Sequence, residues 1–134
     1  MDYSRFQWPY KTILIADDDM LSRRYFSKVL EPTKAKLDFV KNGKEAVDYC
    51  FRNPEVDLVL MDIKMPLKDG LTATRELKAK YPRLPVIVET AYAFDYDKKN
   101  TLLSGADEFI TKPIKREQLF DMMGKYLGAQ DEIR

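Results

Sequence analysis

Several apolar runs of this sequence end abruptly in a residue that can do chemistry. In chain order these residues are the pair Asp17 and Asp18, then Asp62, Thr90 and Lys112. A carboxylate that closes a buried run costs free energy unless something offsets its charge. Three carboxylates brought close together cannot all stay ionised without compensation, and a hard divalent cation with oxygen ligands supplies it. We therefore expect a Mg²⁺ site, with Mn²⁺ as the alternative ion.

The remaining polar residues indicate what such a site would act on. Lys112 adds a fixed positive charge beside the cation, and Thr90 adds a hydroxyl donor. Two cations and a hydroxyl around one carboxylate suit a phosphoryl group in transfer. The chain contains no histidine, which excludes Ser/His/Asp and Cys/His catalysis and any histidine-ligated metal.

Five strands that alternate with five helices must position these residues. Apolar, partly β-branched runs predict strands at residues 12–16, 36–40, 56–62, 85–90 and 107–111. Apolar periodicity and helix-end signals predict helices at about 20–31, 44–52, 70–80, 95–104 and 115–127. Strict alternation predicts one α/β domain with a parallel sheet and helices on both faces. The strand at 36–40 is flanked by lysines, so we place it at a sheet edge.

Individual residues refine these elements. Asp19 suits the N-cap of the first helix, whose apolar stripe is predicted to contain Leu21, Tyr25 and Val29, with Phe26 and Leu30 beside it. The second helix is expected to turn Ala46, Val47, Cys50 and Phe51 to one face, with Cys50 as a small core residue.

The two ends of the chain carry weaker signals. Residues 1–11 contain four aromatic side chains without a clean period, which predicts a leader or linker that packs lightly. The alternative is an ordered arm that contacts a neighbouring domain. Residues 129–134 are expected to form a C-terminal tail.

Composition excludes several classes of function. A net charge of +1 gives no basic field for nucleic acid, and the apolar runs are too short to span a membrane. One cysteine excludes an intramolecular disulfide and a cysteine-ligated zinc site. We expect a cytoplasmic location.

Residues 12–128 resemble the receiver domain of two-component response regulators. The matching pieces, in order, are residues 13–19, 61–66, Asp69-Gly70, Thr90-Ala91, 105–107 and Lys112-Pro113. Each piece alone is weak, whereas the ordered set at this spacing is specific. The resemblance implies a flavodoxin-like three-layer (βα)5 fold with strand order 2-1-3-4-5.

The resemblance also implies a role for each site residue. Asp62 would be the phosphoacceptor, Asp18 a direct Mg²⁺ ligand, Asp17 the holder of metal-bound water and the Lys64 carbonyl a further ligand. Lys112 would pair with Asp62 and then with the phosphoryl oxygens, which Thr90 and the Ala91 N–H would also bind. Phe109 occupies the aromatic switch position, and the Lys112-Pro113 bond would be cis.

Three positions depart from the family pattern. Glu89 stands where an apolar residue or an amide is more usual, Lys64 places a cation beside the acceptor, and Tyr92 is bulky enough to cover part of the site. These residues are expected to tune the lifetime of the phosphoryl group.

The implied function is a phosphorelay switch that takes a phosphoryl group from a phosphohistidine on a sensor histidine kinase or a histidine phosphotransfer domain. Catalysis beyond self-phosphorylation and autodephosphorylation is not expected of this domain itself. An output partner or a homodimer would use residues 94–127, and the domain resembles the C-terminal receiver of a hybrid kinase. Two alternatives are an aspartate-nucleophile phosphohydrolase of the haloacid dehalogenase type, suggested by Asp17-x-Asp19, and an unphosphorylated partner-binding receiver.

Overall fold

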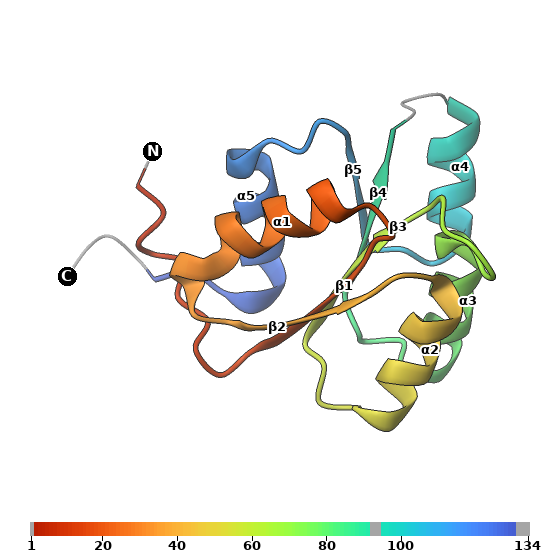
Figure 1. The fold of residues 1–134 in the computed structure, drawn as a ribbon, viewed down its shortest axis with the longest axis horizontal. Helices are drawn as coiled ribbons and strands as arrows, with labels where there is room; N and C mark the ends of the chain where they lie inside the picture. Colours follow the sequence, from red (N-terminus) through yellow and green to blue (C-terminus); the bar gives the residue numbers. More distant parts are fainter. Residues whose placement is uncertain (1, 92–94, 131–134) are drawn as a thin grey trace.

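The computed structural model describes residues 2–91 and 95–130 and contains one five-stranded parallel sheet between two layers of helices (Figure 1). The strands are β1 (Thr12–Ala16), β2 (Lys36–Val40), β3 (Leu58–Asp62), β4 (Val86–Thr90) and β5 (Glu108–Thr111). The helices are α1 (Met20–Leu30), α2 (Gly43–Arg52), α3 (Gly70–Lys80), α4 (Asp95–Leu103) and α5 (Arg116–Leu127), and a short 3₁₀ turn, η1 (Glu31–Thr33), follows α1. Helices α1 and α5 cover one face of the sheet, and α2, α3 and α4 lie on the other (Figure 1).

The strand order is β2-β1-β3-β4-β5, as the resemblance implied, with β2 at the predicted edge. Side chains alternate along each strand and build two cores. Ile13 and Ile15 pack in the core beneath α1 and α5, whereas Leu14 and Ala16 pack in the core beneath α2 and α3. The order makes β1 and β3 neighbours at the centre, so the residues that follow them meet at one edge.

Side-chain caps fix where the helices begin. Asp19 accepts a hydrogen bond from the Ser22 N–H at 3.2 Å, which confirms its predicted role as the N-cap of α1. Asp69 caps α3 in the same way through the Thr72 N–H at 2.9 Å. The next residue, Gly70, lies so close to β3 that a Cβ would stand 2.0 Å from the Asp62 carbonyl oxygen. Glycine therefore lets the loop after Asp62 fold back tightly onto the strand.

Two predicted helix faces are wrong in part. Leu21 is 71% exposed and Phe51 is 43% exposed. Three of the predicted apolar residues, Phe26, Val29 and Leu30, form the buried side of α1. Leu21 lies in the first turn of α1, and its side chain faces solvent rather than the core. Cys50 is buried, as predicted.

The N-terminal segment packs far more tightly than predicted. Phe6 and Trp8 are 1% and 2% exposed and belong to the core beneath α1 and α5. The Phe6 ring packs against Phe120, with ring centroids 5.2 Å apart. A Cβ at Gly124 would stand 2.9 Å from the Phe6 ring, so glycine in α5 makes room for this contact. The expectation of a lightly packed leader is therefore wrong for residues 6–8.

The structure also bears on two narrower predictions. The Lys112-Pro113 bond is cis, as the resemblance implied. Within the described residues, no helix combines the length and the apolar composition that crossing a membrane requires.

Candidate functional site

The acidic residues predicted to converge do converge. Asp17 and Asp18 follow β1, Asp62 ends β3, and one carboxylate oxygen of each lies within 4.8 Å of the others. Asp17 is fully buried and Asp62 is 6% exposed, whereas Asp18 faces solvent. The Asp17 carboxylate accepts from the Asp19 N–H at 2.9 Å, and the Arg23 guanidinium donates to the Asp17 carbonyl at 2.8 Å. The turn after β1 is thereby held in place.

Lys112 brings a positive charge to this cluster. Its Nζ atom lies 3.3 Å from Asp62 Oδ1 and 4.0 Å from Glu89 Oε1. Burial alone would lower the pKa of Lys112, but the carboxylates of Asp62, Glu89 and Asp17 outweigh it and raise that pKa. Lys112 is therefore a permanent cation beside Asp62.

Asp62 itself has an unusual environment. Burial raises the pKa of its carboxyl to about 6, and Lys112 opposes that rise while Asp17 and Asp18 add to it. Without a cation beside them, Asp17 and Asp18 therefore add to the free-energy cost of ionising Asp62.

Glu89 is a fourth acid that the sequence marked only as a departure. The register pairs Asp62 with Glu89, so both side chains point to the α1 and α5 side of the sheet. Burial raises the pKa of Glu89 well above its usual range, and Asp17 and Asp62 add to the shift. Its oxygens and Asp17 Oδ2 are buried without a hydrogen-bond partner among the described residues when both acids are ionised. A protonated Glu89 can donate to Asp17, which satisfies both groups.

A cavity of about 280 Å³ opens above the cluster. Its lining includes every predicted ligand or phosphoryl-binding residue except the buried Asp17: the residues are Asp18, Asp19, Asp62, Ile63, Lys64, Thr90, Ala91 and Lys112. A group that enters this space meets the Asp62 carboxylate with Lys112 and Thr90 beside it. The structure therefore brings these predicted residues together around one cavity, whereas Asp19 and Ile63 were not predicted to line it.

Phe109 does not line this cavity. It packs in the core beneath α2 and α3, and the register pairs it with Val88. Thr90, two residues after Val88, faces that same side. Phe109 and Thr90 thus lie on the face of the sheet opposite to Glu89. The two predicted switch residues therefore share one face, and the Asp62 and Glu89 side chains lie on the other. Tyr92 lies outside the described residues.

The donor set fits the predicted metal. Three carboxylates around one point, with a solvent-exposed side at Asp18, provide oxygen ligands and leave room for water. Mg²⁺ prefers such sites because it keeps several of its waters.

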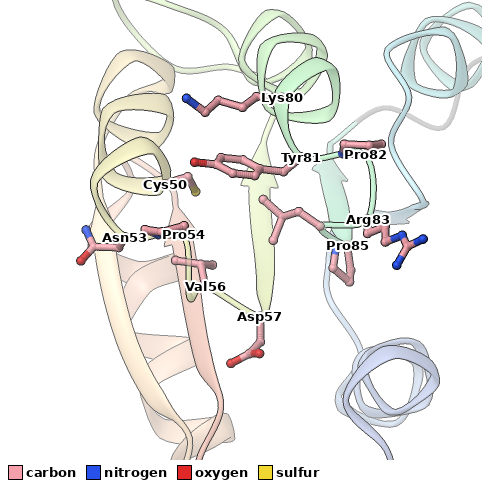
Figure 2. A pocket seen from close by; sticks show the side chains of 11 residues that line it. Cys50, Asn53, Pro54, Val56, Asp57, Lys80, Tyr81, Pro82, Arg83 and Pro85 are labelled. Atoms are coloured by element: carbon pink, nitrogen blue, oxygen red, sulfur yellow. The ribbon is translucent and has the colours of Figure 1, made fainter.

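A larger crevice of about 470 Å³ lies at the opposite end of the sheet and is lined by residues between Cys50 and Pro85 (Figure 2). Its lining contains one acid, Asp57, whose Oδ2 accepts from the Thr12 N–H at 2.8 Å. Its lining therefore differs from that of the cavity above the acidic cluster, which contains Asp18, Asp19 and Asp62.

Sequence comparisons relate this chain to known receiver domains and to proteins that contain them. The family model of the response regulator receiver domain matches residues 13–124. Histidine protein kinase 1 of Candida albicans is 40% identical over 130 residues, which cover 89% of this chain but 5% of that protein. The chemotaxis protein CheY of Halobacterium salinarum is 34% identical, with 89% of this chain and 98% of that protein covered.

Solved structures agree with these sequence matches. The receiver domain of a sensor histidine kinase from Pseudomonas aeruginosa, which holds a magnesium ion in its active-site cleft, gives a TM-score of 0.81 at 31% identity. The match covers 88% of this chain and 98% of that one. The chain therefore spans a small part of its kinase relative and nearly all of the single-domain relatives.

Proposed function

Because this chain belongs to the response regulator receiver domain family of two-component signalling, we propose that Asp62 is its phosphoacceptor. The observation that carries the proposal is the position of Asp62, between the acidic pair and Lys112 at the floor of the cavity. A carboxylate oxygen of Asp62 attacks the phosphorus of a phosphohistidine, the P–N bond breaks, and an acyl phosphate forms. The chain has no histidine, so the donor lies outside these residues.

The other site residues have distinct tasks in this proposal. Asp17, Asp18, Asp62 and the Lys64 carbonyl would hold Mg²⁺, which when bound neutralises charge on the phosphoryl oxygens. Lys112 neutralises Asp62 before transfer and can turn to the phosphoryl oxygens afterwards, because its Nζ is already 3.3 Å from the acceptor. Thr90 and the Ala91 N–H line the same cavity and would bind the remaining oxygens.

The partner follows from the donor chemistry. We infer that a sensor histidine kinase or a histidine phosphotransfer domain supplies the phosphoryl group, in line with the kinase relative. An output partner or a second copy would use the surface of residues 94–127. We also propose that residues 12–128 form the signalling domain proper, carried at the C-terminal end of a hybrid kinase in the cytoplasm.

The test is phosphorylation with acetyl phosphate and Mg²⁺, read by intact-protein mass spectrometry. The wild-type protein is expected to gain one phosphoryl group, and Asp62→Asn none. Asp19→Asn is the matched control, because Asp19 lines the same cavity and asparagine also caps helices. It should label as the wild type does. Stoichiometric labelling of Asp62→Asn would show that another residue is the acceptor.

A further inference from the structure

The crevice at the opposite end of the sheet has the size of a ligand site. It lies between the loop that joins α2 to β3 and the loop that joins α3 to β4, far from the acidic cluster (Figure 2). We call it the proline crevice, because Pro54, Pro82 and Pro85 contribute to its walls. Its volume of about 470 Å³ falls within the range of small-molecule sites, roughly 300–1,000 Å³.

The base of the proline crevice is apolar and held in place. Cys50 and Leu84 are 1% and 9% exposed, and both pack in the core beneath α2 and α3. Burial raises the pKa of the Cys50 thiol to about 12, so this side chain stays neutral. The three prolines restrict the backbone of both loops. A compact apolar group can therefore enter a space that already exists.

The upper edge of the crevice carries an available cation and a hydroxyl. The Lys80 ammonium and the Tyr81 hydroxyl both point toward α2 (Figure 2). Lys80 Nζ lies 4.4 Å above the centre of the Phe51 ring, and in the described part of the chain no carboxylate lies within 4.0 Å of it. The neighbouring Lys78 differs, because it is bound to Asp107 and to the Leu84 carbonyl.

We propose that the proline crevice binds a small organic carboxylate with a compact aromatic or aliphatic body. The body occupies the space between Cys50, Leu84 and the Tyr81 ring, and the carboxylate meets Lys80 and the Tyr81 hydroxyl. Charge complementarity selects an anion, since Asp57, the one acid in the lining, is already bound to the Thr12 N–H. This site is independent of phosphorylation.

The experiment is a titration of the ¹⁵N-labelled full chain with 3-phenylpropionate, compared with its uncharged amide, 3-phenylpropionamide. Saturable shifts are expected at residues 50–57 and 80–85, with a dissociation constant on the order of millimolar for a ligand of this size. The amide should bind about two- to fivefold more weakly, because a surface ion pair contributes that much. Lys80→Gln should bind the carboxylate two- to fivefold more weakly than the wild type does, and should bind the amide with unchanged affinity.

Two variants serve as controls. Lys28→Gln removes a lysine from the last turn of α1, as Lys80→Gln does from the last turn of α3, and should bind as the wild type does. Asp62→Asn should also bind normally, which separates this site from the phosphoacceptor. Equal affinity for the amide and the carboxylate would overturn the proposal. So would shifts confined to other residues, or shifts at 50–57 that appear on raising the protein concentration alone, since these would indicate self-association.

Discussion

At the scale of single residues, the surroundings of Asp62 set both its ionisation and the stability of the fold. Its folded-state pKa of about 6 lies above the ordinary 3.8 of an unfolded chain. A carboxyl with a raised pKa holds its proton more tightly in the fold, so its contribution to stability is complete below pH 4 and is lost as the pH rises through 6. Desolvation of the carboxylate is the main cause.

This predicts an unusual pH dependence for the protein without divalent cations. A rise of the Asp62 pKa from 3.8 to about 6 corresponds to about 3 kcal/mol of folding free energy, of which about 1 kcal/mol is lost between pH 5 and 8. Urea denaturation in EDTA at these two pH values measures it. Asp62→Asn should flatten the dependence, because the amide does not ionise. An unchanged fall in that variant would assign the effect to other groups, of which buried Glu89 is the first candidate.

The same crowding of carboxylates predicts a response to Mg²⁺. An ion that binds the folded cluster stabilises the fold, and at tenfold excess over its dissociation constant the melting temperature should rise by about 4 °C. Asp18→Ala should abolish this rise while retaining the fold, since Asp18 is exposed. Asp48→Ala is the matched control, because Asp48 is a partly exposed acid paired with Lys44 outside the site. A normal Mg²⁺ response in Asp18→Ala would place the ion elsewhere.

At the scale of elements, the sequence predicted all five strands and five helices, because apolar runs and helix caps are local signals. Asp19 and the buried Cys50 were identified correctly for that reason. Leu21 and Phe51 were predicted to be buried but are exposed. Apolar periodicity predicts which side of a helix faces the core, but not how far the core extends along that side. The position of Glu89 required the register between β3 and β4, which pairs it with Asp62. The amino-acid sequence alone predicts neither the burial of Glu89 nor its proximity to Lys112.

Thr90, β5 and α4 form the part of the fold most suited to switching. Thr90 and Phe109 lie on the same side of the sheet, and the exposed Leu102 and Leu103 show that the C-terminal turn of α4 buries little of its apolar surface. Low burial means that this segment opens at small cost. A phosphoryl group shifts the balance between two states only by binding them differently, and we propose that Thr90 and Lys112 supply that difference.

Beryllofluoride with Mg²⁺, a phosphoryl mimic, should therefore change amide hydrogen exchange most at residues 90–112, of which 92–94 lie outside the described residues. Helices α1 and α2 should change less. Thr90→Ala should still accept a phosphoryl group at Asp62 but show a smaller exchange response. Changes confined to the loop after Asp62 would indicate a phosphoryl carrier in a relay rather than a switch of surface.

At the scale of the whole molecule, the N-terminal and C-terminal segments of the chain are hydrogen-bonded to each other. The Trp8 indole N–H donates to the Gly128 carbonyl at 2.8 Å, and the Gln130 N–H donates to the Arg5 carbonyl at 2.8 Å. This contact could not be predicted from the sequence, because residues 2–9 form no regular element and their aromatic side chains have no period. Two of the residues that contact Phe6, Gly124 and Phe120, are more than 100 residues away in the chain.

We therefore expect the N-terminal arm to contribute to the stability of the domain that carries the site. Trp8→Ala should lower the free energy of unfolding by about 3–5 kcal/mol, because it empties a fully packed indole site and breaks the bond to Gly128. Tyr10→Ala is the matched control: Tyr10 is 95% exposed, so its truncation should change stability by less than about 0.5 kcal/mol. Urea denaturation, followed by far-UV circular dichroism, measures both variants. Equal effects of the two substitutions would mean that the arm is not docked in solution. A loss confined to Trp8→Ala, with phosphorylation of Asp62 retained under folding conditions, would show that the arm stabilises the domain without taking part in its chemistry.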